Sequence, residues 1–346
     1  MDLHKNTSSF SVKDKNGKII DACKIPTEPF AIKDYLRKFS QPLSLVLEPV
    51  SQWYFYADLI QNLGIDVHLA NPLKIKAIAS TRIKTDKIDA NVLCDLLRTN
   101  FLPEAYFSPM EVRSWKEMVR FRASLINIRT QVKNKVFAII SKNGLSFYAT
   151  RLFGKAGRRW LKSLRLPNQF QISLDRYIEL VEYLDQLVEE ADKEIKSAIS
   201  DNKQAMLLTS IPAVSYVSAL TIVAEIGDIK RFPSSKKLMS YAGLVPSTYA
   251  SGETVRHGRI TKRGSRWLRW TMIEIAQRQI LCKKKQGFGW YYMKIRQRKG
   301  SSTAAVATAR KLLAVVFRLL KDNRPFKENY LKKLEVRDAC RKTIVS

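Results

Sequence analysis

Apolar and polar residues alternate along the first part of the chain, and the period of the pattern then changes to that of helices. Strand-like runs are interrupted by stretches with helical spacing and by Gly, Asn and Pro positions typical of turns. The expected elements are a hairpin of strands at 7–12 and 18–25, strands at 43–48 and 65–69, and helices at 53–63 and 86–99. Strands that alternate with helices predict an α/β domain over residues 1–105, with helices packed on a mixed or parallel sheet.

Helical periodicity dominates the middle of the chain, residues 106–206. Residues 111–143 and 174–200 are expected to form two long helices, and the basic segment 153–160 interrupts the pattern between them. Two long helices joined in this way predict an antiparallel helical hairpin or coiled coil. An element of this kind can hold partner subunits or span nucleic acid.

The last large region, residues 207–330, is expected to be a mostly helical domain. The pattern predicts helices at 217–226, 235–241, 265–281 and 304–320. Residues 244–263 have no clear period and are expected to form a loop, and residues 331–346 are expected to form a polar tail. The predicted fold class is therefore α/β followed by all-α regions.

A large excess of positive charge indicates what kind of partner the protein binds. Of 346 residues, 61 are Lys or Arg and 31 are Asp or Glu, which gives a formal net charge of +30. Such an excess repels itself unless it meets an anion, so nucleic acid is the expected partner and a membrane surface the second candidate. No apolar run reaches the length of about 18 residues that a transmembrane helix needs, and the start lacks the apolar segment of a secretion signal. A cytoplasmic protein with no membrane partner is expected.

Cysteine and histidine positions exclude two kinds of site. The four cysteines (Cys23, Cys94, Cys282 and Cys340) have no paired spacing, so reduced thiols are expected and neither a zinc site nor a disulfide framework. The three histidines are far apart in the sequence, so a metal site based on histidine is not expected.

Four carboxylates are candidates for a metal site. Asp86 and Asp89 are three residues apart at the start of a predicted helix, so they share one face, where like charges repel unless a cation neutralises them. Glu48 follows a predicted strand and Asp2 begins the first one. Taken singly, each acid has a simple structural explanation. Together they predict a site for two divalent metals, which could act on a phosphoryl group.

A serine beside a basic stretch is the second candidate. Ser251 precedes Gly252, and from spacing alone this pair is more simply explained as a turn than as a nucleophile. Residues 255–299 contain fourteen Lys or Arg and a single acid, Glu274, which is too uneven for an ordinary solvated surface. The candidate nucleic-acid contacts are Arg256, Arg259, Lys262, Arg263, Arg266, Arg269, Lys283, Lys284 and Lys285.

Two further features of the third region bear on nucleic-acid binding. The aromatic group at 288–292 is expected to stack on bases, whereas Trp267 and Trp270 are expected in the helix core. The Ile211-Pro212 segment resembles a helix-hairpin-helix turn, whose backbone N–H groups contact phosphate, but Ala213 and Ser215 replace the usual glycines. That segment is either a phosphate contact or a packing corner.

Taken together, these motifs resemble a known family. They are Asp2-Leu3-His4-Lys5, Glu48-Pro49, Lys84 to Ala90, Glu225-Ile226-Gly227-Asp228, Tyr241 to Pro246, Ser251-Gly252 and Arg259 to Ser265. The chain resembles, over nearly its whole length, the DEDD-type insertion-sequence transposases that include the pilin-gene invertase and are also described as bridge-RNA-guided serine recombinases.

This resemblance implies a fold and a chemistry. The first domain would be RNase H-like (RuvC-like), with Asp2, Glu48, Asp86 and Asp89 as a catalytic tetrad that binds Mg²⁺ or Mn²⁺. Ser251 would be the nucleophile that forms a phosphoserine link. The implied partners are donor and target DNA, a structured guide RNA (the bridge RNA) and further copies of the chain in a dimer or tetramer, in the nucleoid of a prokaryotic cell.

Other functions remain open at the level of sequence. The leading hypothesis is a DNA recombinase that breaks and rejoins strands by serine attack. The alternatives are a metal-dependent junction-resolving nuclease that uses water, and a nucleic-acid-binding protein without catalysis.

One departure from the family pattern concerns the first strand. Asp2 follows Met1 directly, where relatives carry several more residues. A ligand on a fraying strand end is held loosely, so a form extended at the N-terminus is expected to bind Mg²⁺ more tightly in titration calorimetry.

Overall fold

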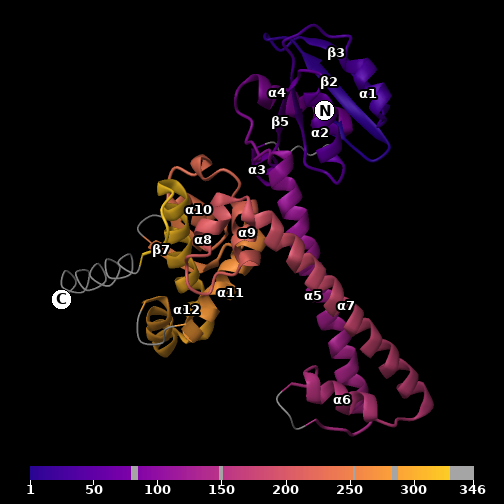
Figure 1. Ribbon diagram of the computed structural model, residues 1–346. Helices are drawn as coiled ribbons and strands as arrows, with labels where there is room; N and C mark the ends of the chain where they lie inside the picture. Colours follow the sequence, from indigo (N-terminus) through magenta and orange to yellow (C-terminus); the bar gives the residue numbers. More distant parts are fainter. Residues whose placement is uncertain (79–84, 148–150, 252–253, 283–286, 328–346) are drawn as a thin grey trace, which may run out of the picture. The chain divides into compact units, whose positions relative to one another are not determined.

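The structure is a computed structural model (Figure 1) that describes residues 1–78, 85–147, 151–251, 254–282 and 287–327. The chain divides into two compact units, Met1–Ser108 and Pro109–Ser346, each described by itself below. Among the described residues, no helix is long and apolar enough to cross a membrane. The finer division of the second unit into a coiled-coil region, a transposase domain and a tail stays a prediction.

Two small sheets form the centre of the first unit. Strands β1 (Asp2–Leu3), β2 (Thr7–Lys13) and β3 (Ile19–Pro26) are antiparallel neighbours in that order, and Asp2 lies opposite Ser9. Strands β4 (Ser44–Leu47) and β5 (Asp66–Leu69) form a parallel pair. The Met1 amine donates to the carbonyl oxygen of Val46 at 3.0 Å, which ties the start of β1 to β4. The predicted hairpin and both predicted single strands are confirmed.

Four helices cover these strands: α1 (Pro29–Leu36), α2 (Trp53–Gln61), α3 (Pro72–Ile78) and α4 (Asp86–Arg98). The α4 helix packs on β1, β2 and β4, and its buried Leu93 contacts the same apolar cluster as Val46. Thr85 caps the start of α4, where its side-chain oxygen accepts from the Ile88 amide at 3.3 Å. The cap and the apolar face together fix where the first turn of α4 lies.

The second unit begins with a long helical hairpin, as the sequence predicts. Helices α5 (Met110–Lys142) and α7 (Asn168–Ser200) run side by side, and the short basic α6 (Lys155–Ser163) lies at the far end of the pair (Figure 1). Their seam buries Leu125, Val132, Val181, Leu184 and Val188. This apolar stripe at helical spacing stabilises the hairpin by burial.

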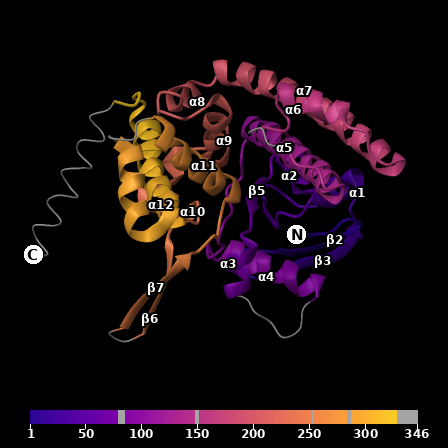
Figure 2. The same cartoon turned by 90° about the horizontal axis from the view of Figure 1, so that it is seen from below.

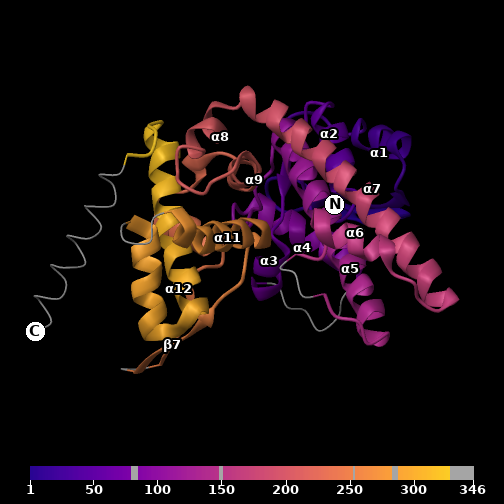
Figure 3. The ribbon, with the colours of Figure 1, turned by 60° about the horizontal axis from the view of Figure 1, so that its bottom comes forward.

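The remaining helices build the main core of this unit. They are α8 (Lys203–Leu208), α9 (Tyr216–Ile226), the 3₁₀ turn η1 (Ile229–Arg231), α10 (Ser235–Tyr241), α11 (Arg266–Cys282) and α12 (Gly287–Asp322). The α9 helix is buried along nearly its whole length, and α11 packs against α12 and α9 (Figure 3). The helical hairpin is anchored here, because Val119, Ile195 and Ile199 belong to the same apolar cluster.

One sequence prediction for this unit is wrong, whereas the helix predicted at 304–320 is confirmed as part of a longer one. Residues 244–263 are not a loop: β6 (Pro246–Ser251) and β7 (Thr254–Ile260) form an antiparallel hairpin that projects from the helices (Figure 2). Most of its residues are exposed, so no apolar face marks the alternation. The last helix starts at Gly287 and bends at Gly300, whose φ of 80° breaks the helical pattern before residue 304.

Candidate functional site

An acidic cluster lies at the start of the first strand. Asp2 on β1 is buried, and His4 Nε2 is 3.1 Å from Asp2 Oδ2 and 3.5 Å from Asp86 Oδ1 at the start of α4. One ligand atom from each of these three side chains lies within 4.8 Å of the other two. The packing of α4 on β1 therefore brings together two carboxylates that are more than eighty residues apart in the sequence.

Electrostatics distinguish the two carboxylates. Burial raises the pKa of Asp2, His4 opposes that shift, and the charges of Asp86 and Asp89 add to it. The pKa of Asp86 is lowered, first by the hydrogen bond from Lys24 Nζ at 2.8 Å. A further cation beside Asp2 would offset both its burial and the neighbouring acids, which oppose its negative charge.

The other two predicted ligands lie close by. Asp89 is one turn along α4 from Asp86, and its charge reaches Asp2. Glu48 directly follows β4 and is half-buried, and its charge acts on the Met1 amine next to Asp2. The four acids predicted from sequence therefore gather in one part of the first unit.

The donor set fits a divalent cation. Hard cations such as Mg²⁺ take carboxylate oxygens at about 2.0–2.1 Å, which places opposite ligands about 4.2 Å apart. The separations within the Asp2, His4 and Asp86 group are compatible with that spacing. A hollow of about 360 Å³ adjoins it, lined by Ser9, Phe10, Ala22, Cys23, Lys24, Thr85, Asp86 and Lys87.

Sequence reasoning missed His4. The expectation of no histidine-based site considered only the distance between histidines. Asp2 and His4 are two residues apart where β1 ends, and in an extended chain residues at that spacing point to the same side. The period of the strand was the signal that could have found the pair.

Ser251, the predicted nucleophile, lies in the second unit. It is the last residue of β6, pairs in register with Thr254 and is exposed. The hairpin that carries it projects from the helices (Figure 2). An exposed hydroxyl on a projecting hairpin can be reached by a large substrate such as a nucleic-acid strand.

A buried carboxylate fixes the base of that hairpin. Glu225 is 3% exposed, accepts from Arg120 Nη2 at 2.6 Å and accepts from Ser265 Oγ at 2.9 Å. Gly264 has φ +85°, and a Cβ there would collide with the Tyr241 carbonyl oxygen. Segments quoted above as family motifs thus meet around one buried charge.

Lys116 on α5 is also buried beside Glu225. Its pKa is lowered to about 8 by burial, and Arg120, Arg231 and Arg113 add to the shift while Glu225 opposes it. The Glu225 carboxylate therefore lies among several cations.

Comparison with known proteins agrees with these motifs. A DEDD transposase model of the IS110 type matches residues 1–142, and a model described as the transposase IS116/IS110/IS902 family matches residues 205–292. The chain belongs to the IS110/IS116/IS902 family of transposases. It is therefore an enzyme that cleaves and rejoins DNA.

Relatives of this transposase match along most of its length. The transposase for insertion sequence element IS1111A of Coxiella burnetii is 25% identical over 78% of this chain and 74% of that protein. The "Probable family 20 transposase" of Pseudomonas aeruginosa is 23% identical over 92% of this chain and 95% of that protein. The pilin gene-inverting protein of Moraxella bovis is 27% identical over 75% and 74%, respectively.

The basic candidates of the transposase fall into three groups. Arg256, Arg259, Lys262, Arg263 and Arg266 are exposed on or just after the hairpin. Arg269 is half-buried and donates to the Ala242 carbonyl oxygen at 3.1 Å, so it also holds the turn after α10. Lys283, Lys284 and Lys285 lie outside the described residues.

The aromatic side chains differ from expectation. Phe288 and Tyr292, predicted to stack on bases, are buried in the core. Lys294 covers the Trp290 ring at 4.5 Å, and Lys311 covers the Tyr291 ring at 3.8 Å. Trp270, expected in the core, is instead 49% exposed.

Proposed function

We propose that this transposase cuts and rejoins DNA strands by attack of the Ser251 hydroxyl on a DNA phosphate, assisted by a metal site at Asp2, Glu48, Asp86 and Asp89. The observation that carries the proposal is the gathering of these acids on β1, β4 and α4. The exposed Ser251 on a basic hairpin supplies the second part.

The metal would be Mg²⁺ or Mn²⁺, held by carboxylate oxygens with His4 beside them. Bound there, it would supply charge stabilisation for a phosphate in reaction and make an attacking or leaving oxygen easier to ionise. Lys24 already holds Asp86 ionised by its hydrogen bond, which keeps one ligand ready to bind.

An RNase H-like fold for the first unit is part of the proposal. The bond from Met1 to Val46 links the start of β1 to β4, although the two strands belong to separate sheets. In an RNase H-like fold these sheets would join in the order β3-β2-β1-β4-β5. The pair β4 and β5 is parallel and the other three strands are antiparallel, which is the arrangement of a mixed sheet of that type.

The chemical step replaces one phosphorus–oxygen bond by another, so the number of bonds at phosphorus stays the same. A bond forms between Ser251 Oγ and the phosphorus while a phosphorus–oxygen bond to the adjoining deoxyribose breaks. The serine proton goes to a base or to solvent, and the leaving oxygen takes up a proton as a free hydroxyl. Exposed arginines such as Arg256 and Arg259 would stabilise the extra negative charge on the phosphate and hold the DNA backbone.

A structured guide RNA and assembly into a dimer or tetramer in the cytoplasm complete the proposal. The net charge of +30 supports contact with more nucleic acid than one duplex segment. The long hairpin of α5 and α7 is an element suited to holding partner subunits.

A denaturing gel tests the serine directly. Purified protein is incubated with Mg²⁺, RNA transcribed from the flanking sequence and labelled element-junction DNA. We expect a covalent protein–DNA band for the wild type and for Ser247→Ala, a control on the same strand, and none for Ser251→Ala. Cleavage by Ser251→Ala without any covalent band in the wild type would refute serine attack and favour the nuclease that uses water.

A further inference from the structure

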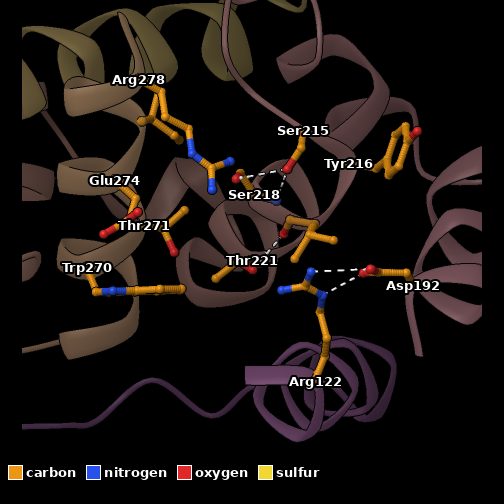
Figure 4. Close-up of a pocket in the computed structure, with 12 residues that line it drawn as sticks. Arg122, Asp192, Ser215, Tyr216, Ser218, Thr221, Trp270, Thr271, Glu274 and Arg278 are labelled. Carbon is orange, nitrogen blue, oxygen red and sulfur yellow. Dashed lines mark hydrogen bonds and ion pairs between the residues drawn. The ribbon is translucent and has the colours of Figure 1, made fainter. Parts of the chain in front are cut away.

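A pocket lies within the second unit, between α5, α7, α9 and α11 (Figure 4). It encloses about 320 Å³, and its lining includes Arg122, Ser215, Trp270, Thr271, Glu274 and Arg278. That volume is at the lower end of the range for small-molecule sites and suits a single nucleotide. Neither Ser251 nor any residue of the acidic cluster lines this pocket.

One wall is a polar and aromatic stripe on α11. Trp270, Thr271, Glu274 and Arg278 face the pocket together, as the helical period requires (Figure 4). Trp270 is 49% exposed, which leaves the ring accessible at the mouth. A base can stack on such a ring whatever its sequence.

The hydroxyl of Thr271 is available for a hydrogen bond to a ligand in the pocket. Its residue is 3% exposed, and its Oγ1 atom has no hydrogen-bond partner among the described residues. A threonine within a helix ordinarily bonds its own preceding turn, as Thr221 does to the Val217 carbonyl oxygen at 2.6 Å across the same pocket. A buried hydroxyl without a partner costs free energy that a ligand would recover.

The opposite wall is the start of α9. Ser215 caps this helix of 11 residues, and its Oγ accepts from the Ser218 amide at 3.3 Å. The first N–H groups of a helix have no partner within it and attract anions. Arg278 points toward these serines in Figure 4 and forms no ion pair within the part of the chain that the structure describes. The pocket thus has a place for a phosphate beside a place for a base.

At the third wall, the charges of Arg122 and Asp192 compensate each other. Arg122 on α5 donates to Asp192 on α7 at 2.5 Å and 3.3 Å, so this arginine is held in place across the hairpin. Glu274 remains as a carboxylate that can only accept hydrogen bonds. It would repel a phosphate at its own side of the pocket and accept from N–H groups on a base edge.

We infer that this pocket takes one unpaired nucleotide of a bound nucleic-acid strand, with the base on Trp270, its edge toward Thr271 and Glu274, and its phosphate at the start of α9 beside Arg278. The inference deepens the proposed function and rests on it, because it assigns the second unit a site that reads a base flipped out of a duplex. Guanine, with two adjacent N–H donors, matches the Glu274 carboxylate best.

The test uses 20-base-pair duplexes of DNA and of RNA, each with one central bulged nucleotide, and the same duplexes with an abasic bulge. Binding is measured by fluorescence anisotropy on the full chain. We expect the wild type to bind a guanine bulge about tenfold more tightly than the abasic bulge, in the range of base–aromatic stacking. The duplex type that gives the difference identifies the strand as DNA or RNA.

Variants separate the pocket from general binding. Thr271→Val and Trp270→Ala are expected to lose most of the tenfold difference, and Trp270→Phe to keep it in part. Thr308→Val is the matched control, because Thr308 Oγ1 is equally buried without a partner among the described residues but lies on α12, outside the pocket. Thermal unfolding of Thr271→Val should occur at or above the wild-type temperature, since no protein hydrogen bond is removed and a buried hydroxyl without a partner is lost.

Three results would overturn the inference. Equal affinity of the wild type for guanine and abasic bulges, in both DNA and RNA, would refute the pocket while leaving the proposed function intact. An unchanged difference in Trp270→Ala and Thr271→Val would do the same. Failure to bind any duplex would refute the pocket and the proposed function together.

Discussion

Lys116 offers a direct test of the electrostatics in the second unit. It is 8% exposed and its pKa is lowered to about 8, from an ordinary value near 10.5 in the unfolded chain. Between these two values, the unfolded chain holds a proton that the folded chain has released. Raising the pH through this window therefore favours the folded state.

The magnitude follows from the two pKa values. Linkage between them predicts that Lys116 contributes about 2 kcal/mol more to the free energy of unfolding at pH 9.5 than at pH 7. Other groups titrate in the same range, but their contributions cancel when the wild type is compared with Lys116→Met. We expect the difference between the two proteins to shift by that amount in favour of the wild type as the pH rises.

Urea unfolding followed by tryptophan fluorescence measures the stability of the second structural unit, which contains Lys116. Five of the six tryptophans belong to Pro109–Ser346, so the signal reports mainly on it. Lys193→Met on α7 is the control, because Lys193 is 73% exposed in its side chain and its replacement removes a lysine without touching the buried cluster. Parallel pH dependence of the wild type and Lys116→Met would refute the argument from burial.

Three further outcomes are expected. Asp86→Asn combined with Asp89→Asn should abolish DNA strand transfer in a gel assay while the protein still unfolds cooperatively, because neither side chain belongs to the buried core; undiminished strand transfer would contradict the proposed metal site. Gly264→Ala should lower the urea midpoint far more than Gly64→Ala, since both have positive φ but only the first would collide with a carbonyl oxygen; equal losses would contradict the close approach. Anisotropy titrations with duplex DNA should show affinity falling with salt at a log–log slope of about −0.9 for each phosphate neutralised, and a flat dependence would exclude an electrostatic interface.

Much of the fold could be predicted because burial follows the period of the element. The long helices α5 and α7 and the strands of the first unit each bury one face or one run of apolar side chains. The hairpin of β6 and β7 escaped prediction for the opposite reason. Both of its faces are largely exposed, so its backbone pairing has no counterpart in the apolar pattern.

Some residues of the candidate site could likewise be predicted from the sequence pattern, and others could not. Asp86 and Asp89 could be predicted to share a face from spacing alone, and the structure brings Asp2 to them through the packing of α4 on β1. His4 and Lys24 could not be placed by counting along the chain, because their contacts to Asp86 depend on how β1 and β3 lie beside α4. Trp270 was misplaced because a helix with apolar residues on several sides does not reveal which side its neighbours cover.

The helical hairpin also sets a length. Val119 lies in the main core of the second unit and Ile140 in the cluster around α6, 21 residues further along α5. At 1.5 Å per residue these residues span about 32 Å, close to one full turn of a DNA duplex. Exposed Lys155 and Arg159 on α6 are carried at that distance. The hairpin therefore holds this basic end about 32 Å away from the main core.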